Sequence, residues 1–200
     1  MIRILVIGAE GTVGKAVVAE LGRRHDIVKA GRKSGDLHVD IADENSIRAM
    51  YAKLGKVDAV VSTAGHVHYG PLASMTGEQF KSGLLDKLLG QVNLVLIGQA
   101  FVNDGGSFTL TSGVTDRDPI RQAANSSCVN GGLGGFVKSA AIEMPRALRI
   151  NVVSPALLEE SAKKYDGYFP GHETVSAARV GLAYAKSVEG ALTGQVIIAG

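Results

Sequence analysis

The first residues that could do chemistry form a glycine-spaced stretch, Gly8-Ala-Glu-Gly-Thr-Val-Gly14, directly after an apolar run. Small residues let the backbone approach a diphosphate, and the free N–H groups at a helix start stabilise its charge. The spacing is GxxGxxG rather than the GxGxxG dinucleotide fingerprint, and tight packing alone could also explain the glycines. Glu10 must point away from the phosphates or be screened. We predict a cofactor-binding loop that consists of Gly8, Gly11, Thr12, Val13 and Gly14.

A basic turn, Gly31-Arg-Lys-Ser34, stands where a dinucleotide site meets the adenosine ribose. A site for NAD usually places a carboxylate there, whereas a guanidinium and an ammonium pair with a 2′-phosphate. The alternative is a solvated basic turn. The residues Arg32, Lys33 and Ser34 therefore favour NADP(H), with NAD(H) still possible.

The elements that must position these residues alternate along the chain. Apolar β-branched runs predict strands at 2–7, 26–31, 37–39, 58–62, 107–111, 150–154 and 195–199. Helical patterns predict helices at 15–21, after Asp43, from the capping box at Thr76 to about 101, up to about 143, and at 175–187. Strands joined by crossover helices form a parallel sheet that is covered on both faces. We predict one α/β domain over residues 1–200, a Rossmann-type doubly wound parallel sheet in three α/β/α layers.

Composition excludes several classes of function. The net charge is +2, with Lys and Arg scattered, which argues against a nucleic-acid partner. The single cysteine, Cys128, cannot form an internal disulfide, is expected to be buried, and belongs to no His/Cys cluster that would bind a metal. No signal peptide and no apolar run of about 18 residues are evident, so we expect a cytoplasmic protein without a membrane partner.

Several segments together resemble the short-chain dehydrogenase/reductase family. The glycine loop spans the family's seven residues, Asp40-Ile41 matches its adenine-contacting pair, and Ser62-Thr-Ala-Gly65 is similar to its NAG motif. Further matches in the right order are Thr111-Ser112, Arg149-Ile-Asn-Val-Val-Ser-Pro155 and Leu192-Thr-Gly-Gln195. The resemblance implies cofactor contacts from Asp40, Ile41, Ala64, Gly65 and Pro155, and a catalytic role for Ser112.

The resemblance fails at the residues that carry the family's proton chemistry. The family exchanges a proton through the tyrosine of Tyr-x-x-x-Lys, but Ser126 and Asn130 occupy these two positions. The family's asparagine on the preceding helix is replaced by Lys87 in Lys87-Leu-Leu-Gly90. The lysine and the asparagine have thus exchanged places, and we predict that Lys87 reaches the nicotinamide ribose from the opposite helix. His66, His68, Tyr69, Tyr165 and Tyr168 are the candidates for the missing acid, and each could equally be an ordinary loop residue.

The segment after Asn130 contains four glycines in a predicted helix: Gly131, Gly132, Gly134 and Gly135. Each costs about 1 kcal/mol relative to alanine in a helix interior, so a close backbone neighbour is the simplest reason for them. That neighbour is either the helix around 87–94 or the same helix of a second subunit. We expect a homodimer or a higher homo-oligomer.

The sequence leaves more than one function open. The first is an NADP(H)-dependent oxidoreductase with an atypical active site, acting on a small carbonyl or alcohol substrate. The second is a catalytically inactive NADPH-binding regulator or sensor, favoured by Ser126 and Asn130. A third is another chemistry on the same scaffold, such as a reaction of nucleotide sugars.

Overall fold

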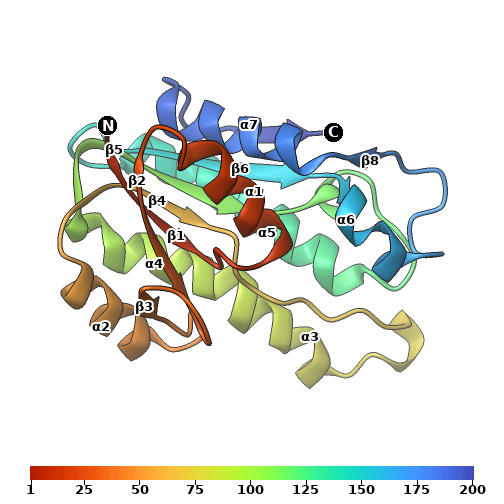
Figure 1. Cartoon of the computed structure of the whole chain (residues 1–200). Helices are drawn as coiled ribbons and strands as arrows, with labels where there is room; N and C mark the ends of the chain where they lie inside the picture. The colour runs from red at the N-terminus through yellow and green to blue at the C-terminus, as the bar shows by residue number, and fades with distance from the viewer.

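The computed structural model describes residues 1–200 as one parallel sheet with helices on both faces (Figure 1). The strand order is β3-β2-β1-β4-β5-β6-β9, and every neighbouring pair is parallel. The strands are β1 Arg3–Ile7, β2 Asp26–Gly31, β3 Leu37–His38, β4 Val57–Ser62, β5 Val102–Thr111, β6 Arg149–Pro155 and β9 Val196–Ala199. The main helices are α1 Thr12–Leu21, α2 Glu44–Leu54, α3 Gly77–Gly83, α4 Gly90–Gly98, α5 Ala124–Glu143 and α7 Ala177–Glu189. The predicted doubly wound fold is confirmed.

The alternation of side chains along the strands separates two hydrophobic cores. On β1, Leu5 and Ile7 belong to the cluster under α2, α4 and α5, whereas Ile4 and Val6 belong to the cluster under α1 and α7. Successive side chains on a strand point to opposite faces, so a run that is apolar throughout must be covered on both. All four of these side chains are buried.

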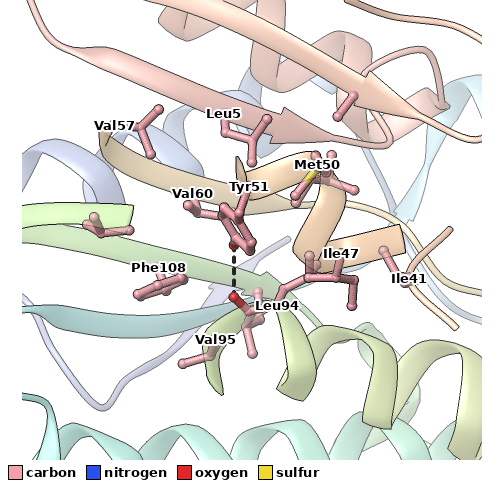
Figure 2. Packing of buried hydrophobic residues seen from close by; sticks show 14 of the residues in the cluster. Leu5, Ile41, Ile47, Met50, Tyr51, Val57, Val60, Leu94, Val95 and Phe108 are labelled. Carbon is pink, nitrogen blue, oxygen red and sulfur yellow. Dashed lines mark hydrogen bonds between the residues drawn. The ribbon is translucent and has the colours of Figure 1, made fainter. Parts of the chain in front are cut away.

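Helix α2 shows how the sequence signals work locally. The Asp43 side chain accepts a hydrogen bond from Asn45 N–H, which is the predicted N-cap. Ile47 on this helix is fully buried, and the Tyr51 hydroxyl, one turn further on, donates to the Leu94 carbonyl at 2.8 Å (Figure 2). This bond satisfies a polar group in the core and links α2 to α4.

The segment from α3 to α4 is continuous helix, with a π-helical stretch at Leu84–Leu89 between the two. The Thr76 capping box is present at its start. By length and composition the 25 residues Gly77–Phe101 could cross a membrane, which differs from the expectation that no such segment exists. The same test is passed by helices that pack on a sheet, and α4 buries Leu94 and Val95 against the sheet.

Several local features differ from the expectations. Strand β5 begins at Val102, earlier than 107, because Val102 pairs with Val57 before a register shift. A small separate sheet pairs β7 Leu157–Leu158 with β8 Thr174–Val175. Cys128 is exposed on α5 and not buried, because its helix face is not covered by another part of the chain.

Candidate active site

The glycine loop forms a close turn between β1 and α1. Gly8 has φ +80°, which only glycine adopts readily, and a Cβ on Gly14 would overlap the Gly8 carbonyl oxygen and lie 2.8 Å from Ala9 Cα. Gly11 caps α1 without a side-chain hydrogen bond, so no side chain occupies the N–H groups of the first turn. A closely packed turn at a free helix start fits a diphosphate. Lys29 Nζ lies 3.2 Å from Glu10 Oε1 and screens this carboxylate.

A smaller cavity of about 240 Å³ opens between the glycine loop and the end of β2. Of the predicted cofactor residues, the following line it: Gly8, Gly11, Arg32, Asp40, Ile41, Ala64 and Gly65. Lys33 and Ser34 do not line it, although both are exposed on the same turn. Apolar residues such as Ile41 and Ala64 line this cavity together with the Arg32 guanidinium and the carboxylates of Asp40 and Asp86, and this mixed lining fits the adenosine end of a dinucleotide.

A larger cavity of about 560 Å³ extends from the glycine loop across the carboxyl ends of the strands. Its wall includes the predicted residues Gly11, Thr12, Val13, Ala64, Gly65, Lys87, Ser112, Ser126, Asn130 and Pro155. Ligands of open α/β sheets bind at this edge of the strands. The two cavities share Gly11, Ala64 and Gly65, so one extended ligand could occupy both.

Lys87 lies within hydrogen-bond distance of Asn130, its exchange partner in the sequence comparison. Its ammonium donates to Asn130 Oδ1 and to the Ser112 carbonyl, each at 2.8 Å. Lys87 comes from the π-helical stretch, a distortion that is frequent at functional sites. Gly65 permits the approach, since a Cβ there would lie 2.8 Å from Lys87 Cα. Burial lowers the pKa of Lys87 to about 8, and the negative charge of Asp116 partly opposes this.

The hydroxyl of Ser112 is directed by a carboxylate that the sequence analysis missed. Ser112 Oγ donates to Asp116 Oδ2 at 2.9 Å, and Ser154 Oγ donates to Asp116 Oδ1 at 3.0 Å. Arg117 bonds both Asp116 and Ser154. Because the Ser112 hydroxyl donates its hydrogen to Asp116, it can only accept hydrogen bonds from a ligand in the cavity. The signal for Asp116 was its place four residues after Ser112, beyond a strand's carboxyl end.

Ser126 is buried in a cluster of polar groups. It hydrogen-bonds Thr115 Oγ1 at 2.9 Å, Asn130 Nδ2 at 3.3 Å and the Tyr69 hydroxyl at 3.4 Å. Asn130 Nδ2 also donates to Thr115 Oγ1 at 2.8 Å. Thr115 is a second residue that sequence reasoning missed.

The candidates for the missing acid differ in whether they line the larger cavity. Tyr69, Tyr165 and His66 line the larger cavity, whereas His68 and Tyr168 do not. His66 is exposed and its ring lies 3.5 Å from the Asp86 carboxylate. Tyr69 is the only one of the five whose side chain bonds Ser126.

The glycines of α5 do not meet another backbone within the chain, which contradicts only the first of the two expected neighbours, the helix around 87–94. A Cβ on Gly132 would lie 3.1 Å from the Leu88 side chain, and one on Gly134 would lie 3.4 Å from Val196. Gly131 and Gly135 face open space. The helix around 87–94 is thus the neighbour of one glycine only, and through a side chain.

Comparison with known proteins identifies the family. The model of the family described as enoyl-(acyl carrier protein) reductase matches residues 8–188. The chain belongs to the short-chain dehydrogenase/reductase family. Members of this family are oxidoreductases that use NAD(P)H.

Individual proteins resemble the chain over most of its length. The crystal structure of the protein lin1944 from Listeria innocua is 48% identical, covers 100% of both chains and superposes with a TM-score of 0.98. The crystal structure of a small-chain dehydrogenase in complex with NADPH is 24% identical and has a TM-score of 0.86. The alignment covers 98% of this chain and 95% of that one. Versicolorin reductase 1 from Dothistroma septosporum is 24% identical, over 88% of this chain and 77% of its own.

Proposed function

We propose that the protein is an NADP(H)-dependent oxidoreductase that acts on a small carbonyl or alcohol compound. The observation that carries the proposal is the Lys87–Asn130 pair, 2.8 Å apart in a cavity that begins at the glycine loop. A bound reduced nicotinamide supplies the hydride. The N–H groups of the first turn of α1 would hold the diphosphate, and Lys87 would donate to the nicotinamide ribose. The substrate occupies the same cavity, beside Ser112 and Ser126.

The loss of the family's tyrosine and lysine is compatible with turnover. A positioned acid or base contributes about 10²–10⁴ in rate, a modest part of what enzymes achieve. One ammonium and one amide remain in the cavity although their positions are exchanged. Slow or substrate-selective reduction is therefore expected.

A titration followed by a turnover assay tests this function. NADPH is titrated against the wild type by fluorescence, and NADPH oxidation is then followed with quinones, aldehydes and ketones. Saturable binding with turnover on at least one carbonyl supports the enzyme. Tight binding without turnover on any of them favours the second candidate, a dinucleotide-binding regulator. The presence of Ser126 and Asn130 at the family's catalytic positions is the observation that favours this candidate.

The cofactor preference is tested at Arg32, the predicted basic residue that lines the adenosine cavity. Arg32→Ala is expected to weaken NADPH binding by about 10- to 100-fold and to change NADH binding less than twofold. The reason is that a charge-assisted bond to a phosphate contributes about 1.5–3 kcal/mol. Arg48→Ala, in an exposed arginine of α2, is the matched control. Equal losses for the two dinucleotides in Arg32→Ala would contradict the NADP(H) preference.

We further infer a homodimer or higher homo-oligomer. Exposed apolar side chains gather along the segment from α3 to α4 and on α5: Leu85, Leu89, Leu96 and Ile142. Gly131 and Gly135 lie open on α5. Sedimentation velocity at micromolar concentration is expected to give a dimer or larger species, and a monomer would refute the inference.

A further inference from the structure

Tyr69 is held over the start of α5 by its neighbours in the chain. The His68 N–H donates to Asn125 Oδ1 at 2.8 Å, and the Gly70 N–H donates to the Gln122 carbonyl at 2.9 Å. These two anchors flank Tyr69 and fix its backbone. The Tyr69 ring also packs against two other tyrosine rings, each with a centroid 6.3 Å away. Its hydroxyl is therefore placed by the fold and not by a free loop.

The direction of the hydrogen bonds near Tyr69 can be worked out from Lys87. An ammonium has donors and no acceptor, so Asn130 must turn its carbonyl oxygen toward Lys87. The Asn130 NH₂ group then faces the hydroxyls of Thr115 and Ser126 and donates to both. Lys87 thereby fixes the orientation of the amide.

The two hydroxyls complete the chain. Thr115 is buried, and Ser126 is the acceptor within reach of its hydrogen, at 2.9 Å. If Ser126 donated to Thr115 instead, the Thr115 hydrogen would be left buried without a partner, which costs about 1–3 kcal/mol. Ser126 therefore accepts from Thr115 and donates to the Tyr69 oxygen. These hydrogen bonds therefore all point the same way, from the Lys87 ammonium to the Tyr69 oxygen. The hydroxyl hydrogen of Tyr69 is then not donated to any of these groups.

We propose that Tyr69 donates the proton to the substrate oxygen, at the end of a hydrogen-bond chain through Lys87, Asn130, Thr115 and Ser126. The inference rests on the proposed function and names the acid that this function needs. A bound reduced nicotinamide would supply the hydride to the carbonyl carbon. As the C=O electron pair moves to oxygen, that oxygen takes the proton and the Tyr69 O–H bond breaks. The phenolate oxygen accepts the Ser126 hydrogen bond and later regains a proton from water.

The other groups in the cavity are less suited to this role. The Ser112 hydrogen is donated to Asp116, and His66 is exposed and paired with Asp86. Burial raises the pKa of Tyr69, the Ser126 hydrogen bond lowers it, and nearby Tyr165 raises it. The net rise keeps the phenol protonated at neutral pH, as a proton donor requires. A bond from Ser126 stabilises the phenolate that the reaction leaves.

Tyr69→Phe tests the proton transfer directly. It keeps the ring and its packing, so kcat for carbonyl reduction is expected to fall by about 100-fold or more while the Kd for NADPH changes less than twofold. Tyr168→Phe is the matched control, because Tyr168 packs edge-on against Tyr69 but does not line the cavity. Unchanged kcat in Tyr69→Phe overturns the role of Tyr69 and leaves the proposed function standing. A wild type that binds NADPH without reducing any carbonyl overturns both.

A second readout needs neither cofactor nor turnover. In protein labelled with ¹³C at tyrosine Cζ, the Tyr69 resonance is assigned by its loss in Tyr69→Phe and titrated with pH. Ser126→Ala removes the donor to the phenolate, so the midpoint for Tyr69 is expected to move upward. An identical midpoint in the wild type and in Ser126→Ala would overturn the hydrogen-bond chain. A midpoint that moves upward in Lys87→Met as well shows that the chain depends on the Lys87 N–H donor, because Lys87 is a neutral amine at the pH where Tyr69 titrates.

Discussion

Gly14→Ala is expected to weaken NADPH binding by about 100-fold or more. A methyl group at this position would overlap the Gly8 carbonyl oxygen and lie 2.8 Å from Ala9 Cα. Both contacts are with backbone, so the loop must open, and the cradle for the diphosphate opens with it. Overpacking of this kind costs about 1–3 kcal/mol, so the thermal midpoint of the free protein should fall as well. Fluorescence titration and thermal unfolding without ligand measure the two effects.

The control for this prediction is another glycine-to-alanine change. Gly77 lies in the first turn of α3, and a Cβ there would have no atom within 4 Å. Gly77→Ala should leave both the affinity and the thermal midpoint near those of the wild type. If Gly14→Ala is folded by circular dichroism and binds NADPH within threefold of the wild type, the diphosphate does not lie on this loop.

The strands and the layer order could be predicted because they follow from local patterns. A run such as Ile4-Leu-Val-Ile7 is apolar at every position, which requires cover on both faces, and the structure provides two cores. Asp43 and Thr76 are caps whose hydrogen bonds need only three or four neighbouring residues. Interactions between residues so close in the chain can be predicted from the sequence alone. By contrast, β5 was predicted too short, because its start depends on pairing with distant Val57.

The site was predictable only where a family pattern or a strand end marked it. The exchange of Lys87 and Asn130 could be read from the motif positions, but the π-helical stretch that carries Lys87 has no composition signal. Asp116 was marked only by its place four residues after Ser112, and Thr115 bonds Asn130, 15 residues away, so nothing local distinguishes Thr115 from a loop residue. Tyr69 was one candidate among five until the bond to Ser126 separated it.

Lys87→Met is expected to lower kcat/KM for carbonyl reduction by about 100-fold. The substitution keeps much of the side-chain volume but removes the donor to Asn130 and to the Ser112 carbonyl. Asn130 then loses the partner that fixes its amide, and each buried group left unpaired costs about 1–3 kcal/mol. The proposed contact to the nicotinamide ribose is lost at the same time, so the Kd for NADPH should rise too. Lys81→Met, in an exposed lysine of α3, is the control.

The dependence of kcat/KM on pH tests whether Lys87 acts through its charge or only through its packing. Burial lowers the pKa of Lys87 to about 8 in the free protein, and kcat/KM reports ionisations of the free enzyme. The ammonium is the active form, so kcat/KM should be level below this pH and fall as the pH rises through about 8. In Lys87→Met this ammonium is absent, so this limb should disappear. If the decrease near pH 8 persists in Lys87→Met, it belongs to another group. If kcat/KM of Lys87→Met is within twofold of the wild type, Lys87 is excluded from the site.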